Sequence, residues 1–73
     1  MTNREVLSIL QAIFQRTHAL RQNNALLDDV AADLGVHPSR LYDACRPLQE
    51  LGLLIMPARF LQLTSIGREL VDG

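Results

Sequence analysis

The sequence contains no lysine and no tryptophan, and its only cysteine is Cys45. A single cysteine cannot form an intramolecular disulfide or a zinc site built from several cysteines. The only aromatic residues are Phe14, Tyr42 and Phe60, so aliphatic side chains must make most of the core. The longest apolar run, Leu53–Met56, is far too short to span a bilayer. These absences favour a small cytoplasmic protein that has no metal, no cofactor and no place in a membrane.

An excess of charge of one sign is also missing. Seven basic residues, all arginine, and eight acidic residues give a net charge of −1. Many small nucleic-acid-binding domains are clearly basic, because neutralisation of phosphates supplies much of their affinity. The 73 residues allow one domain, 1–73. A domain of this size buries only about 60% of the surface of its unfolded chain, so a partner that adds burial would stabilise it.

The first half of the sequence predicts two helices. Thr2–Glu5 has the spacing of a capping box, and apolar residues then recur at helical intervals over Val6–Leu20. After a polar turn, residues 25–27 are expected to supply a very short strand. Leu27–Leu34 is a second amphipathic segment, and it ends at Gly35, where glycine readily adopts the left-handed conformation.

A third helix is predicted from Pro38 to about Leu51. Proline suits the first turn of a helix, because its missing N–H would be unpaired there. Pro47 removes one backbone hydrogen bond inside the helix, so we expect a bend near Asp43–Arg46 or a helix that is regular only in its first half. The residues expected to be buried are Leu41, Ala44 or Cys45, Leu48 and Leu51.

Two short strands, at residues 53–56 and 60–63, are predicted to form a hairpin. Thr64 then caps a last helix, Ser65 to about Val71, in which Ile66, Leu70 and Val71 are expected to be buried. The fold class is therefore mainly α with a small β-hairpin, in the order helix, short strand, helix, helix, strand, strand, helix.

The stretch from Leu27 to Thr64 has the spacing of a helix-turn-helix, and the hairpin adds a wing. Over about residues 5–72 the chain resembles winged-helix regulators of the MarR, PadR and ArsR type. The segments that carry the resemblance are Val30–Val36, Leu48–Leu54 and Leu63–Leu70. The resemblance implies that the second helix of the motif enters the major groove of DNA, that the wing contacts the backbone or minor groove, and that terminal helices form a dimer. The wing of this chain is shorter than is usual in such regulators and holds a single basic residue, Arg59.

The exposed face of the third helix supplies the candidate DNA contacts. Arg40 and Arg46 are suited to guanine edges or phosphates, and Tyr42 to a phosphate. Asp43 places a negative charge at the centre of this face, and it is expected to pair with an arginine three residues away. The predicted DNA-binding residues are Ser39, Arg40, Tyr42, Asp43 and Arg46, together with Arg59 of the wing.

These features favour a small transcriptional regulator that binds double-stranded DNA as a homodimer. The alternative is a winged-helix module that binds another protein instead of DNA, and the near-neutral charge, the acidic second helix and the apolar wing favour it. No nucleophile–base pair or phosphate loop accompanies the acidic residues, so an enzyme is not expected. His37 is expected to cap the third helix, and His18 stands alone.

The apolar stripe of the first helix is wider than one packed face requires, and the hairpin has apolar residues on both faces. Left exposed, these side chains would form a patch of the kind that marks an interface. The alternative is that the last helix folds over the hairpin and covers them. The residues predicted to contact a second copy, or an obligate protein partner, are Val6, Ile9, Leu10, Ile13, Phe14, Ile55 and Phe60.

Overall fold

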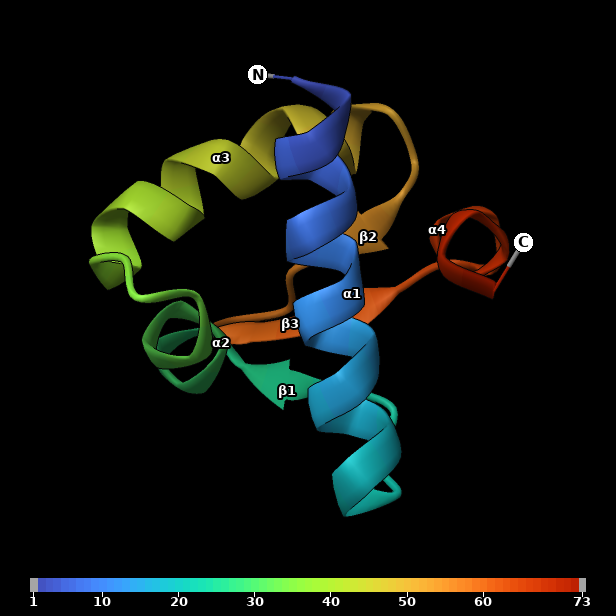
Figure 1. Ribbon diagram of the computed structural model, residues 1–73, viewed down its shortest axis with the longest axis horizontal. Coiled ribbons are helices and arrows are strands. Elements are labelled where there is room, and N and C mark those ends of the chain that lie inside the picture. Colours follow the sequence, from blue (N-terminus) through green and yellow to red (C-terminus); the bar gives the residue numbers. More distant parts are fainter. Residues whose placement is uncertain (1, 73) are drawn as a thin grey trace.

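The computed structural model describes residues 2–72. Its elements are α1 (Asn3–Leu20), β1 (Ala25–Leu26), α2 (Leu27–Leu34), α3 (Pro38–Glu50), β2 (Leu54–Ile55), β3 (Phe60–Leu63) and α4 (Ser65–Asp72). This order confirms the predicted fold class. Figure 1 shows α1 crossing the small sheet. In this view α2 and α3 lie on one side of α1, and α4 lies on the other. No helix within the described residues has the length and apolarity needed to cross a membrane.

Both ends of α1 are closed by hydrogen bonds that the local sequence provides. The Thr2 hydroxyl accepts a hydrogen bond from the Glu5 N–H at 3.2 Å, which is the threonine half of the expected capping box. At the other end Arg21 adopts the left-handed conformation, with φ of 54°. Its N–H and that of Gln22 donate to the last carbonyls of the helix. The chain therefore turns out of α1 and enters β1.

The turn between α2 and α3 has the predicted geometry. Gly35 is left-handed, with φ of 70°, and its N–H donates to a carbonyl near the end of α2. His37 is the N-cap of α3, and its Nδ1 accepts a hydrogen bond from the Ser39 N–H at 3.1 Å. Pro38 then occupies the start of α3, as predicted. These bonds fix the direction in which α3 leaves the turn.

The third helix covers nearly the predicted range, but one of the two effects expected of Pro47 is absent. It remains α-helical past Pro47 to Glu50, so the prediction of a helix regular only in its first half is wrong. A proline removes a single backbone donor, and buried residues before and after it, Cys45 and Leu48, hold this part of the helix against the core. Leu51 was expected to be buried, but it is 67% exposed, because the helix ends there and the chain turns away at Gly52.

The sheet is antiparallel, with strand order β1-β3-β2. In β3, Leu61 and Leu63 face the core while Phe60 and Gln62 face outward, because side chains alternate along a strand. The strand register pairs Leu26 with Phe60, and Ile55 with Gln62. The outward face, here called the outer sheet face, therefore carries Leu26, Ile55, Phe60 and Gln62.

Glycine and threonine determine how α4 packs. The Thr64 hydroxyl accepts a hydrogen bond from the Gly67 N–H at 3.1 Å and donates to the carbonyl of Gly52. A Cβ on Gly67 would lie 2.0 Å from the carbonyl oxygen of Leu53, so only glycine allows this approach of the two backbones. The predicted cap at Thr64 is confirmed.

The side chains of α4 do not point where the sequence predicted. Ile66 and Leu70 were expected to be buried, but they are 56% and 49% exposed. Gly67 is buried instead, and Val71 packs against the core. The reason is the close approach at Gly67, which directs the helix backbone toward the core and turns Ile66 and Leu70 toward solvent. The outer sheet face remains exposed at Ile55 and Phe60, so α4 does not cover it.

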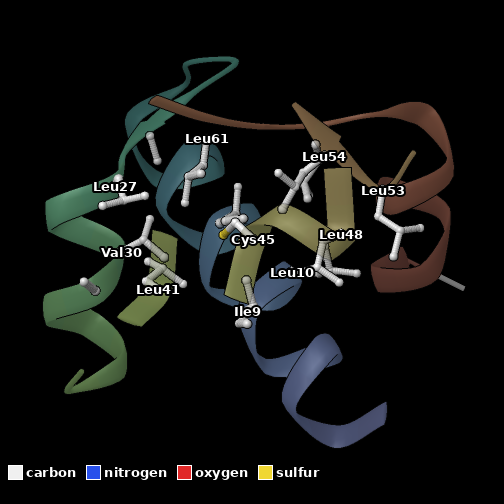
Figure 2. Packing of buried hydrophobic residues seen from close by; sticks show 14 residues of the cluster. Ile9, Leu10, Leu27, Val30, Leu41, Cys45, Leu48, Leu53, Leu54 and Leu61 are labelled. Atoms are coloured by element: carbon white, nitrogen blue, oxygen red, sulfur yellow. The ribbon is translucent and has the colours of Figure 1, made fainter. Parts of the chain in front are cut away.

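The core is aliphatic, as the shortage of aromatic residues required. Figure 2 shows Cys45 of α3 among leucines that come from α1, α3 and the sheet. Ile9, Leu10 and Ile13 were predicted to contact a partner, but they are 7%, 0% and 0% exposed within one chain. Their side chains fill the space between α1 and the rest of the fold, which corrects that part of the predicted interface. The buried core residues are Ile9, Leu10, Ile13, Ala25, Leu27, Val30, Ala31, Leu41, Cys45, Leu48, Leu53, Leu54, Leu61 and Leu63.

Burial makes Cys45 a slow nucleophile. It raises the pKa of the thiol to about 11, from an ordinary value of 9.0, because the thiolate would lose its hydration. We expect a thiol reagent at slightly alkaline pH to label Cys45 only as fast as the chain unfolds, and rapid labelling of the folded protein would contradict this burial.

The folded protein holds the thiol proton more tightly than the unfolded chain does. Stability is therefore expected to be unaffected by this thiol below pH 9.0 and to fall as the pH rises toward about 11.

Candidate nucleic-acid interface

The outer face of α3 carries the predicted DNA-binding residues. Leu41, Cys45 and Leu48 fix one side of the helix in the core. The opposite side is in solvent, and the predicted residues Ser39, Arg40, Tyr42, Asp43 and Arg46 are all exposed, as are Pro47, Gln49 and Glu50. A helix held firmly on one side presents the other at a defined position, which a surface that reads a partner requires.

A hollow of about 520 Å³ lies where α2, the start of α3 and the β2–β3 turn meet; we call it the turn hollow. It brings Arg59 of the turn together with three of the α3 candidates, although these residues are far apart in the sequence. The polar and charged residues that line it are Asp28, His37, Ser39, Tyr42, Asp43 and Arg59. Hydroxyl, imidazole and guanidinium groups therefore share this space with two carboxylates.

Arg59 is attached to α2 at two points. Its backbone carbonyl accepts a hydrogen bond from the Leu27 N–H at 2.7 Å. Its guanidinium donates to the carboxylate of Asp28 and forms an ion pair with it. Ala58, with φ of 55°, makes the left-handed turn that precedes Arg59. The tip of the hairpin thus lies against α2, and the one cation of the wing already has an anionic partner.

Arg40 lies at a second hollow, of about 480 Å³, between α1 and α3. Arg4 and Glu5, from the first turn of α1, line the same hollow. Arg4 was not among the predicted site residues, because nothing local in the sequence places the start of α1 beside the third helix. The structure therefore adds one arginine to the neighbourhood of Arg40.

Asp43 is not paired as the sequence predicted. The ion pairs recorded in residues 2–72 are Arg16–Asp33 and Arg59–Asp28, and neither includes Asp43, Arg40 or Arg46. The carboxylate of Asp43 is therefore available to a ligand. Arg46 lies on the same exposed face, outside the lining of both hollows.

A second ion pair, Arg16–Asp33, joins α1 to α2. Two nitrogens of the Arg16 guanidinium donate to the two carboxylate oxygens of Asp33, at 3.0 and 2.6 Å. The hydrogen bond to Asp33 raises the pKa of Arg16 above its ordinary value. Since Arg16 belongs to α1 and Asp33 to α2, the pair joins the two helices near the turn that leads into α3.

The two histidines have structural roles. His37 caps α3 as predicted, and its Nδ1 also lies 2.8 Å from the Ser39 hydroxyl. His18 stacks on Phe14, with ring centroids 5.8 Å apart. Among residues 2–72, no three histidine, cysteine, aspartate or glutamate side chains gather in a way that could hold a metal ion.

Comparison with known proteins gives no match, whether by family model, by curated sequence or by solved structure. The function is therefore inferred from the chemistry of the α3 surface.

Proposed function

We propose that this protein is a small DNA-binding transcriptional regulator and that α3 lies in the major groove of duplex DNA. The observation that carries the proposal is the division of α3 into a fully buried side and an exposed polar side, directly after the left-handed turn at Gly35. An α-helix fits the major groove, and side chains on its exposed side can reach base edges.

The roles of the α3 side chains follow from their hydrogen-bonding groups. Arg40 and Arg46 donate two parallel hydrogen bonds to guanine or contact phosphates. No ion pair recorded in residues 2–72 includes Asp43, so its carboxylate accepts a hydrogen bond from the amino group of cytosine. The hydroxyls of Ser39 and Tyr42 donate to backbone phosphates and set the register of the helix on the DNA.

Binding to a random duplex at several salt concentrations tests this proposal. A regulator of this kind is expected to bind at low salt, and the logarithm of its affinity should fall with the logarithm of salt concentration by about 0.9 per phosphate contact. Fluorescence anisotropy of a labelled duplex measures both quantities. Absence of binding at low salt would reject DNA as the partner.

A second candidate is a module that binds another protein through the same region. Between Leu27 and Arg59 the sequence has five acidic residues and only three arginines, and Arg59 is paired with Asp28. The outer sheet face is also apolar at Leu26, Ile55 and Phe60. An acidic, partly apolar surface favours a protein partner over phosphates. The salt series separates the candidates, because this module should not bind random DNA.

We also propose that the protein acts as a homodimer joined through the outer sheet face. Of the residues predicted to contact a partner, Ile55 and Phe60 are 47% and 42% exposed there, while Val6 and Phe14 are partly buried. Exposed apolar side chains from adjacent strands are what a self-complementary two-fold interface requires. A dimer would place two α3 helices on one DNA site.

Sedimentation equilibrium at micromolar concentration tests the dimer. The unmodified protein is expected to sediment as a dimer, and Phe60→Ser is expected to weaken association at least tenfold, since it removes a large apolar contact. Ile66→Ser is the matched control, because Ile66 is also a large apolar residue with an exposed side chain but lies on α4. An interface on the sheet would be contradicted if the unmodified protein sediments as a monomer. It would also be contradicted if Ile66→Ser weakens association and Phe60→Ser does not.

A further inference from the structure

We propose that the turn hollow is a binding site for a DNA backbone phosphate, and that in the free protein the Asp28 carboxylate binds Arg59 in place of that phosphate. Asp28 then acts as an internal competitor that lowers the affinity of the protein for DNA. The inference rests on the proposed function, and it adds a phosphate site and a residue that regulates it.

The turn hollow has the groups that a phosphate needs. A guanidinium binds both carboxylates and phosphates. Asp28 accepts one recorded hydrogen bond from the Arg59 guanidinium, so a phosphate oxygen can take its place. The backbone of Arg59 is fixed by the hydrogen bond from Leu27, which keeps the arginine at the hollow when its side chain changes partner. Ser39 and Tyr42 line the same space. The Tyr42 hydroxyl is a further donor to a phosphate, and the Ser39 hydroxyl, which lies 2.8 Å from His37 Nδ1, becomes one when it turns away from that nitrogen. The remaining carboxylate of the hollow, Asp43, lies on the α3 face that we assign to the bases.

The Asp28–Arg59 pair is weak enough to be displaced. The side chains of Arg59 and Asp28 are 61% and 47% exposed, so water screens their attraction. Exposed ion pairs contribute little to stability, and the charged oxygens of a phosphate are strong acceptors for the same guanidinium. Binding of DNA therefore requires this pair to open, and the affinity is lower than it would be with a free Arg59.

The test compares Asp28→Asn with Asp29→Asn in binding to a duplex. Both substitutions remove one negative charge from the first turn of α2, but only Asp28 holds Arg59. Asp28→Asn is expected to bind about fivefold more tightly than Asp29→Asn, a factor that corresponds to an exposed pair. Its salt dependence should equal that of Asp29→Asn, since Arg59 contacts the phosphate in both complexes.

A double variant assigns the gain to Arg59. In Asp28→Asn/Arg59→Gln the extra affinity is expected to disappear, and the salt dependence should become shallower by about 0.9, since the phosphate contact of Arg59 is lost. Equal affinities of Asp28→Asn and Asp29→Asn would overturn the inference and leave DNA binding itself intact. Weaker binding by Asp28→Asn would also overturn it, because Asp28 would then position Arg59 instead of competing for it. Failure of the protein and all these variants to bind at low salt would reject the proposed function as well.

Circular dichroism melts are expected to be the same for the two single variants, so a difference in folding does not account for the result.

Discussion

Replacing Gly67 with alanine is expected to lower the free energy of unfolding by about 2 kcal/mol, in the range typical of overpacked sites. The added Cβ would lie 2.0 Å from the Leu53 carbonyl oxygen, and neither backbone can move without disturbing the Thr64 cap. Helix propensity alone predicts the opposite sign, because alanine is better than glycine inside a helix by about 1 kcal/mol. The sign of the change therefore shows whether the backbone contact exists.

Chemical denaturation of the two proteins measures this difference. Glu69→Ala is the control, because Glu69 is exposed on the same helix and its replacement leaves the contact with Leu53 intact. We expect the control to stay within about 0.5 kcal/mol of the unmodified protein. A stabilised Gly67→Ala variant would show that α4 does not pack against the Leu53 backbone as described.

Substitution of both arginines of the α3 face is expected to reduce DNA affinity about thirtyfold or more. Each contact of an arginine with a base is worth about 1–3 kcal/mol, so Arg40→Ala and Arg46→Ala together remove at least about 2 kcal/mol and, with favourable geometry, much more. Both side chains are exposed and neither takes part in an ion pair recorded in residues 2–72, so little change in folding stability is expected.

Arg68→Ala is the matched control for these two variants. It removes one positive charge, half of what the double variant removes, from an exposed position on α4, away from the α3 surface. Its effect on DNA affinity should be limited to the general loss of one positive charge. If Arg40→Ala/Arg46→Ala binds as well as the control, α3 is not the surface that contacts DNA.

Local signals in the sequence predicted the elements of the fold. Gly35 marked the end of α2 because a left-handed residue is most readily a glycine, and Pro38 marked the start of α3. Apolar spacing located the helices, and turn residues separated the strands. These features depend on residues a few positions apart, which explains why the sequence alone was sufficient for them.

The orientation of α4 and the interior of the core were harder to predict. The exposure of Ile66 and Leu70 depends on the close approach of Gly67 to Leu53, a contact between two separate elements. Similarly, an apolar stripe does not distinguish residues that fill the core of one chain, such as Leu10, from residues that contact a second chain. Both distinctions need the three-dimensional packing.

The sequence predicted which residues of α3 are exposed at the candidate site, but it did not predict which charged side chains of other elements lie beside one another there. The exposed face of α3 followed from helical periodicity, and the structure places all five of its residues in solvent. The Asp28–Arg59 pair joins α2 to the hairpin turn, and Arg4 and Arg40 line one hollow between α1 and α3. Charges that lie close only in the folded chain leave no periodic signal in the sequence.

Mapping the DNA-contacting surface by nuclear magnetic resonance tests the central claim most directly, and the protein is small enough for assignment of its backbone amides. On addition of a duplex at low salt, the amides of residues 39–46 are expected to shift most, together with that of Arg59. The amides of α4 should shift little. Shifts confined to α4 or to the outer sheet face, or no shifts at all, would contradict the proposal that α3 binds DNA.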